Sequence, residues 1–306
     1  MNIDLSPEAR EFGEQALRAF ESAGGDALLQ RAEADPSQRE SLVAPVLAGL
    51  GAWDLEPRTD ADSAEAAAAL CRSAGYWGLP YPLAERLSRP VDIESDGLIV
   101  IAGPAPAATL AGLDGHWATV TLDGQRAQVT GTSGDRTAFV TSLQLTGLDD
   151  AGARDVALAL VLPCWTLLGM LDRALQLTVA HVKLRQQFGQ PLSGFQGVQF
   201  QLTDAEVERS GLEMLARHAL STVTGPDALA DALALRLAAI EAAEVVFRVT
   251  HQLHGAVGFC DETVLSWLSR YSQPLRRLPL GLSATRAQLT ELLGTRGLTG
   301  LYSDAT

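Results

Sequence analysis

Two long helical segments of this chain are joined by Arg185-Gln186-Gln187-Phe188-Gly189-Gln190-Pro191-Leu192. Gly189 and Pro191 end the first segment, because glycine favours turns and proline lacks the N–H donor that a helix needs to continue. The second segment begins at Phe195 and carries apolar residues at three-, four- and seven-residue steps, which is typical of a helix that lies on a core. The stretch therefore predicts a tight turn between two helices of a bundle.

Three side chains at this turn suit the binding of a nucleotide. Arg185 offers a planar fork of donors that fits a pyrophosphate. Phe188 and Gln196 can flank and hydrogen-bond a ring such as adenine. The same residues are also compatible with a plain interhelical turn that carries a surface arginine, so their chemistry alone leaves both interpretations open.

A second stretch follows in the same helical part of the chain, His251-Gln252-Leu253-His254-Gly255-Ala256-Val257-Gly258-Phe259. Gly255 and Gly258 allow a backbone to approach a ligand closely, and Gln252 supplies an amide one turn earlier. His251 and His254 can share one helix face, but no third ligand is in view. We therefore predict no metal site, and we regard two glycines alone as a weak pattern.

Periodicity and turn residues divide the chain into three parts. Residues 1–89 are expected to be helical, residues 90–162 to form a small β unit, and residues 163–306 to return to long helices. Asp123-Gly124 predicts a hairpin, because this turn needs the positive φ that glycine accepts. The expected helices cover residues 7–23, 39–50, 62–76, 165–185, 195–224, 227–254, 261–271 and 283–293. The expected strands cover residues 97–102, 116–122, 127–130, 137–145 and 156–161.

Composition narrows the possible partners. The 306 residues carry 37 acidic and 23 basic side chains, a formal net charge of −14. Because nucleic-acid binding needs lysine and arginine to neutralise phosphates, no DNA or RNA partner is expected. The N-terminus lacks the features of a signal peptide, and three scattered cysteines do not make a disulfide framework. The longest apolar run, 156–171, is shorter than a membrane span, so we expect a cytoplasmic protein without a membrane partner.

In this order, the two stretches resemble the acyl-CoA dehydrogenase family. Its members carry an Arg-x-x-Phe-Gly turn, a Phe-Gln helix start, and a later Gln-x-x-Gly-Gly-x-Gly stretch followed by Glu and Arg, here Glu262 and Arg270. The resemblance implies a mainly α fold with a small central β domain: a helical N-domain, a reduced β-domain and a C-terminal four-helix bundle. It also implies a flavoprotein that introduces an α,β double bond into an acyl-CoA and passes electrons to an electron-transfer flavoprotein.

The sequence departs from this family where a catalytic base is needed. One family position falls in residues 270–281, which contain no acid, and the other falls on Ala159 and Leu160. An apolar side chain cannot abstract a proton, so the catalytic residues stay unknown. The carboxylates near the motifs, Glu241, Glu244 and Glu262, are expected on a solvated helix face or in local ion pairs.

The β segment departs as well. Family members hold the flavin ring with a Thr-Glu-x-x-x-Gly-Ser-Asp type loop and a Trp-x-Thr type strand. Residues 90–162 show no such loop, and Trp117-Ala118-Thr119 only imitates the strand motif.

The retained motifs resemble the shortened, base-lacking subunit of the bacterial heteromeric (α2β2) steroid acyl-CoA dehydrogenases. This resemblance implies that the chain contributes the ADP end of an FAD site in trans to a homologous catalytic subunit, acting on a steroid-derived or other bulky acyl-CoA. Two alternatives stay open: a non-catalytic assembly or regulatory module of the same fold, and a self-sufficient homodimeric dehydrogenase with an unrecognised base. The residues that the resemblance assigns to FAD are Arg185, Gln187, Phe188, Gln196, Gln252, Gly255 and Gly258.

Overall fold

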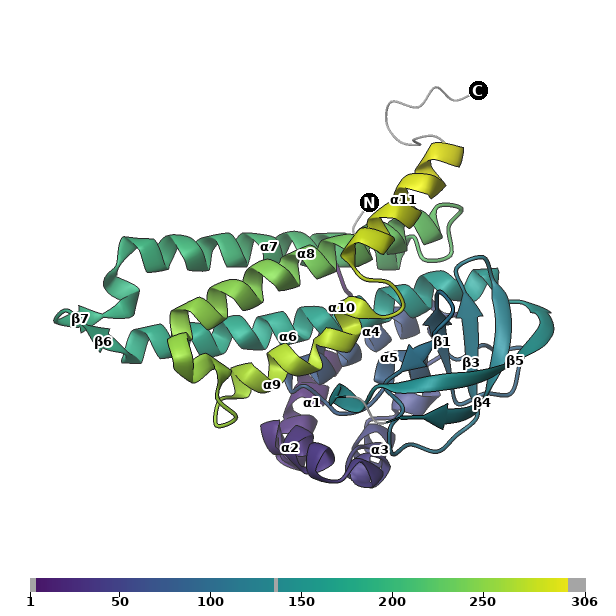
Figure 1. The fold of residues 1–306 in the computed structure, drawn as a ribbon, viewed down its shortest axis with the longest axis horizontal. Helices are drawn as coiled ribbons and strands as arrows, with labels where there is room; N and C mark the ends of the chain where they lie inside the picture. The colour runs from purple at the N-terminus through teal and green to yellow at the C-terminus, as the bar shows by residue number, and fades with distance from the viewer. Residues whose placement is uncertain (1–3, 135–136, 297–306) are drawn as a thin grey trace.

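A computed structural model describes residues 4–134 and 137–296 of the chain. The described part is mainly helical, with a small sheet at one end of a long helical body (Figure 1). This arrangement confirms the predicted fold class. The helices are α1 (Pro7–Ala23), α2 (Asp26–Ala34), α3 (Arg39–Gly49), α4 (Ala61–Tyr76), α5 (Leu83–Leu87), α6 (Val156–Leu184), α7 (Gln196–Ser221), α8 (Ala228–His254), α9 (Val264–Tyr271), α10 (Gln273–Arg277) and α11 (Leu282–Arg296).

The sheet has the strand order β1-β3-β4-β5-β2, with β1 and β3 parallel and the other neighbours antiparallel. Gly124 has φ +89° in the turn between β3 and β4, which confirms the hairpin predicted from Asp123-Gly124. A separate two-stranded hairpin, β6 and β7, joins α6 to α7. The strands are β1 (Gly97–Ile101), β2 (Ala107–Ala108), β3 (Trp117–Thr121), β4 (Gln125–Ser133), β5 (Thr141–Ala151), β6 (Gln186–Gln187) and β7 (Gln190–Pro191).

The strand predicted for residues 156–161 is wrong, because these residues form the first turns of α6. A short apolar run fits a buried strand or a buried helix equally well. The helix continues through Pro163 because its neighbours enclose it: Val161, Leu162 and Trp165 are fully buried. Tertiary packing here outweighs the lost N–H donor of the proline.

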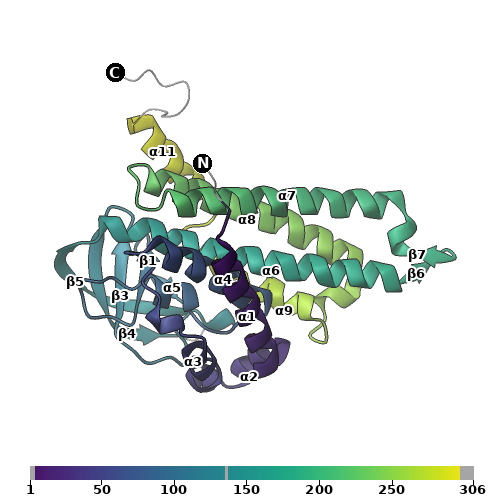
Figure 2. The ribbon, with the colours of Figure 1, turned by 180° about the vertical axis from the view of Figure 1, so that it is seen from behind.

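Residues 153–184, which include α6, are long and apolar enough to cross a membrane, but 83% of their most apolar window is buried inside the protein. The segment is therefore the central core helix of the body. Two glycines bring α4 against it. A Cβ at Gly75 would collide with the Thr166 carbonyl oxygen, and one at Gly169 would collide with the Arg72 carbonyl oxygen. Figure 2 shows α4 and α1 lying over α6 from behind.

An ion cluster ties α4, α6 and α7 together beside this contact. Arg72 of α4 donates to Asp172 of α6 at 2.6 Å and to Glu213 of α7 at 3.0 Å. Arg209 of α7 donates to the same two carboxylates, at 3.2 Å and 2.7 Å, and Arg217 donates to Glu213 at 2.6 Å. Because these charges are shared among several partners in a partly buried site, the cluster fixes the relative positions of the three helices.

A continuous apolar core runs from the N-terminal helices through α6 to α9. We propose the same three-part division for the folded chain, with residues 1–89, 90–162 and 163–306 as its parts. Residues 1–3 and 297–306 of the first and third parts lie outside the described residues.

Candidate functional site

The first motif forms an exposed tip at the end of the helical body that lies farthest from the sheet (Figure 1). Residues 184–196 make up this tip. Its turn has φ +51° at Phe188 and φ +82° at Gly189, the type I′ pattern of a two-residue hairpin. Glycine accepts such a conformation, whereas a phenylalanine held there is strained.

Several side chains at the tip are exposed to solvent. The Phe188 side chain is 91% exposed and lies edge-on to Phe195, with ring centroids 6.2 Å apart. The side chains of Arg185, Gln187 and Gln196 are exposed, and no hydrogen bond or ion pair to them is found among the described residues. An exposed aromatic in a strained turn beside a free guanidinium contributes little to the stability of the chain itself, which favours a role in binding.

The structure brings the second motif next to the tip. The ring of His181, one turn before Arg185, stacks on His254 at the end of α8 with centroids 4.4 Å apart. Gln252 is exposed on the same end of α8. Burial lowers the pKa of both His181 and His254, so the stacked pair is neutral at pH 7. This contact places the C-terminal end of α8 one helical turn from the start of the tip.

The two glycines of the second motif differ. Gly255 has φ +65° and open space around its Cα, so its backbone is accessible to a ligand. A Cβ at Gly258 would lie 2.9 Å from the Cβ of His254 and 3.3 Å from Nδ1 of His251, so the close packing of this chain already requires that glycine. The described residues contain no group of three or more His, Cys, Asp or Glu side chains that suits a metal ion.

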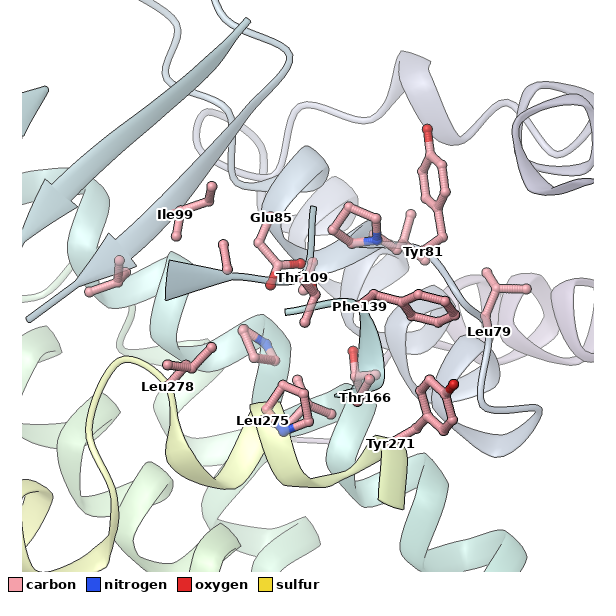
Figure 3. A pocket seen from close by; sticks show the side chains of 18 of the residues that line it. Leu79, Tyr81, Glu85, Ile99, Thr109, Phe139, Thr166, Tyr271, Leu275 and Leu278 are labelled. Atoms are coloured by element: carbon pink, nitrogen blue, oxygen red, sulfur yellow. The ribbon is translucent and has the colours of Figure 1, made fainter. Parts of the chain in front are cut away.

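A cavity of about 100 Å³ lies at the other end of α6, between α5, the sheet, α6 and α10 (Figure 3). We call it the central cavity. Both segments in which the family resemblance places a catalytic base line this cavity, and both present non-acidic side chains there. These are Ala159, Leu160, Tyr271, Pro274, Leu275, Leu278 and Pro279.

The central cavity does contain a carboxyl group that the sequence analysis missed. Glu85 of α5 lines the cavity and is half-buried. Burial raises the pKa of Glu85, while its own backbone N–H and the Arg39 guanidinium act in the opposite direction. In the sequence, Glu85 is an acid in a short helix of mixed composition, beside Arg86 and three apolar residues, so only the tertiary structure shows what that acid faces.

The other carboxylates named from the sequence lie outside this cavity. Glu241 pairs with Arg286 at 2.6 Å, and Glu244 and Glu262 are exposed. The imitation of the Trp-x-Thr strand is also turned inward. Trp117 is 2% exposed and Thr119 is fully buried, with its hydroxyl donating to the Ala127 carbonyl at 3.2 Å.

The residues present therefore fit one part of an FAD molecule. At the tip, a free guanidinium, free amides and an exposed aromatic match the pyrophosphate and adenine of the ADP moiety. No comparable set of unpaired donors is found on β3, the strand that imitates the family motif for holding the flavin ring. From Met170, the residue of α6 that lines the cavity nearest the tip, to Arg185 at the end of the helix, 15 helical steps correspond to about 22 Å. The tip thus does not belong to the chain's own cavity.

Comparison with known proteins defines the class. Residues 161–279 match the acyl-CoA dehydrogenase C-terminal domain family. The whole chain superposes on a steroid acyl-CoA dehydrogenase variant, Tcur3481-Tcur3483, with a TM-score of 0.77, 21% identity, and coverage of 96% of this chain and 99% of that one. It also superposes on the ChsE4-ChsE5 complex from Mycobacterium tuberculosis, with a TM-score of 0.74, 18% identity, and coverage of 98% and 100%.

The chain therefore has the acyl-CoA dehydrogenase fold, and residues 161–279 belong to the acyl-CoA dehydrogenase C-terminal domain family. Two curated relatives are similar in sequence over about a third of the chain. The acyl-CoA dehydrogenase IpdE2 of Mycolicibacterium smegmatis is 33% identical over 114 residues, 37% of this chain and 35% of that relative. The 3-sulfinopropanoyl-CoA desulfinase of Paraburkholderia xenovorans is 31% identical over 103 residues, 34% of this chain and 26% of that relative.

These two relatives carry different reaction names, so the shared segment does not by itself determine a reaction. The match to them spans only about a quarter to a third of their length. The activity, substrate and partners of this chain are accordingly matters of proposal.

Proposed function

We propose that this chain is the partner subunit of a heteromeric, FAD-dependent acyl-CoA dehydrogenase in the cytoplasm. It assembles with a homologous catalytic subunit as α2β2 and serves the oxidation of a steroid-derived or other bulky acyl-CoA, with an electron-transfer flavoprotein as acceptor. One observation carries the proposal: the uncommitted binding groups lie at the tip, about 22 Å from a cavity that has no acid at either expected base position.

In this role the tip binds the ADP end of an FAD whose ring lies in the catalytic subunit. The Arg185 guanidinium faces the pyrophosphate, Phe188 stacks on the adenine, and the amides of Gln187, Gln196 and Gln252 donate to polar groups around it. Gly255 leaves its backbone open to the cofactor. FAD, when bound, supplies the two-electron acceptor for oxidation of a CH–CH bond. The family match and the donor set at the tip support this cofactor.

The position of the partner is supported by apolar residues exposed along α7. Phe200 is 59% exposed, Val207 63% and Met214 51%, and they recur at seven-residue steps along one face of the helix. Such a stripe at heptad spacing is typical of a seam between packed helices. It begins next to the tip, so a subunit that covers α7 also meets the residues proposed to hold FAD. We call these three residues the α7 stripe.

One observation favours a second candidate, the self-sufficient homodimer. Glu85 provides a carboxyl inside the central cavity, where the sequence alone showed none. In that case Glu85 is the proton acceptor, and the α7 stripe joins two copies of this chain. The other alternative, an assembly module without cofactor contacts, leaves Arg185 and Phe188 without a role.

The deciding experiment is the visible spectrum of the chain purified alone and after co-expression with a full-length homologue, with subunits counted by size-exclusion chromatography. The partner-subunit role predicts a colourless chain alone and a yellow tetramer with about two flavins per four chains. A chain that is yellow and active alone supports the homodimer. A tetramer whose flavin content does not change with Arg185→Ala supports the assembly module.

A further inference from the structure

Two histidine rings connect the last turns of α6 and α8. His181 of α6 and His254 of α8 lie face to face, with ring centroids 4.4 Å apart and ring planes inclined by 20°. Figure 1 shows that both helices end on the side of the body that carries β6 and β7. We call these two residues the histidine pair. Because the rings come from segments far apart in the sequence, their contact helps to fix how the two helix ends lie relative to each other.

Each member of the histidine pair adjoins residues of the proposed ADP site. The carbonyl oxygen of His181 accepts from the Arg185 N–H at 2.8 Å, where the chain leaves α6 for the tip. His254 is the last residue of α8 and lies between Gln252 and Gly255 in the sequence. The contact between the two rings therefore influences how Arg185 lies relative to the residues of the second motif.

The hydrogen bond of His254 determines where its proton lies. Nδ1 of His254 is 2.9 Å from the carbonyl oxygen of Thr250, which can only accept, so Nδ1–H is the donor. The neutral ring carries no proton on Nε2, and protonation there creates a cation on a residue that is 9% exposed. His181 is half-buried. Histidine has an ordinary pKa of about 6.5, so both rings can gain a proton below neutral pH.

The charged groups around the histidine pair do not compensate a positive charge on it. Burial lowers the pKa of both rings, and Arg185 beside His181 and His251 beside His254 act in the same direction. Burial and Arg276 lower the pKa of His251 in turn. Among the described residues, no carboxylate forms an ion pair with either ring of the pair. Two protonated rings at this separation would therefore repel each other without a counterion.

We propose that the histidine pair is a pH-dependent contact that positions the tip beside the end of α8, and that protonation of both rings releases the tip. The consequence for FAD rests on the proposed function, because the tip is there the ADP-binding end. His181 is thus a positioning residue that acts through Arg185. Val182 in the same turn is 1% exposed and packs in the main core, so release is confined to the end of α6 and the tip.

The direction of the pKa shifts determines the pH range in which the contact is lost. Because both pKa values are lowered in the folded chain, the neutral pair is complete above about pH 6.5 and is lost as pH falls through the lowered values. Each proton that only the released state binds favours release about tenfold per pH unit.

The test is hydrogen–deuterium exchange of residues 184–196 in the full chain without flavin, at about pH 7.5 and about pH 5, corrected for the intrinsic rate of exchange at each pH. Protection of the tip should fall at least about tenfold at the lower pH. His181→Phe keeps an aromatic ring in the stack but cannot be protonated, so its tip should be equally protected at both pH values. His181→Ala removes the stack and should leave the tip poorly protected at both.

Two further measurements complete the test. His116→Phe, at an exposed histidine directly before β3, is the matched control and should keep the pH dependence of the natural chain. In the co-expressed complex at limiting FAD, flavin occupancy should fall severalfold at the lower pH with the natural chain and stay constant with His181→Phe. The comparison between these two chains removes any effect of pH on the catalytic subunit itself.

Three outcomes would overturn the proposal. The first is protection of the tip that does not change with pH in the natural chain. The second is a pH dependence that persists in His181→Phe, which would assign the titration to His251. The third is full protection in His181→Ala. If the tip responds to pH as expected while flavin occupancy does not, the histidine pair is confirmed and the role of the tip in binding FAD fails, so the two failures are distinguishable.

Discussion

The polar side chains at the two ends of α6 differ in how many hydrogen-bond partners they have within the chain. Around the central cavity, Arg39 donates to three backbone carbonyls, and Tyr81 and Tyr271 donate to carboxylates of the same chain. Much of the apolar wall belongs to the main core. At the tip, Arg185 and Phe188 are exposed, and the chain itself gives them almost nothing to bind. The difference indicates that the polar side chains near the cavity stabilise the chain itself, whereas those at the tip are available to bind another molecule.

The largest expected effect is on assembly, through the α7 stripe. Val207→Glu places a charge in the centre of the proposed seam and should weaken assembly with the catalytic subunit at least a hundredfold, because an unpaired charge buried in an apolar interface costs about 3 kcal/mol or more. Size-exclusion chromatography of the co-expressed pair measures it. Val91→Glu, at a site 73% exposed and away from α7, is the control. A tetramer that persists in Val207→Glu would place the partner elsewhere.

The next largest effect is on stability, through the ion cluster that lies between the two ends of α6. Burial alone would raise the pKa of Glu213, but Arg72, Arg209 and Arg217 outweigh it and lower this pKa to about 2. Because the folded pKa lies below the ordinary value of 4.5, the stabilisation is present above about pH 4.5 and disappears as pH falls toward 2. Glu213→Gln should lower the free energy of unfolding at pH 7 by about 2 kcal/mol, as for a broken, partly buried ion pair.

Chemical denaturation of Glu213→Gln across pH 2 to 8 measures this prediction. The variant should lose part of the rise in stability between about pH 2 and 4.5 that the natural chain shows. Glu8→Gln, an exposed acid outside the cluster, should keep it. Equal stability of the natural chain and Glu213→Gln at pH 7 would mean that packing alone holds α4, α6 and α7 together.

At the tip, replacing a charged side chain should weaken binding of the cofactor and leave the stability of the chain unchanged. Arg185→Ala should lower the flavin occupancy of the complex about tenfold at limiting FAD, since a charged hydrogen bond to a phosphate contributes about 1.5–3 kcal/mol. Its unfolding midpoint should stay within error, because its side chain has no partner in the chain. Arg10→Ala, an exposed arginine of α1, is the matched control. The ratio of flavin absorbance to protein absorbance gives the occupancy.

Local signals in the sequence predicted much of the fold. The hairpin at Asp123-Gly124 was predictable because two adjacent residues decide it. The turn at Gly189 followed for the same reason. These are short-range effects that do not depend on the rest of the molecule.

The features that the sequence analysis missed depend on tertiary contacts. Residues 156–161 carry an apolar run whose helical form is decided by contacts with other helices, and no property of the run itself distinguishes the two outcomes. Glu85 looked like an ordinary acid of a short segment, and its importance arises from the cavity that distant residues such as Phe139 and Leu278 enclose around it. The tip motif was visible because it is local, and the cavity was not because it is tertiary.

The smallest predicted effects come from replacing Phe188, which should stabilise the chain and weaken flavin binding. Phe188 occupies the first central position of a type I′ turn, where asparagine is favoured and phenylalanine is strained. Phe188→Asn should therefore raise the free energy of unfolding by about 0.5–1 kcal/mol, measured by denaturant titration. The same change removes the aromatic face proposed for adenine, so flavin occupancy of the complex should fall severalfold.

Val91→Asn separates the backbone effect from the loss of exposed apolar surface, because Val91 is 73% exposed but has no left-handed φ. It should change neither stability nor flavin content by a comparable amount. If Phe188→Asn stabilises the chain and leaves flavin unchanged, the strained phenylalanine contacts the partner protein and not the cofactor. If it destabilises the chain, the edge contact with Phe195 matters more than the turn, and the tip is then organised partly for this chain, as the cavity end is.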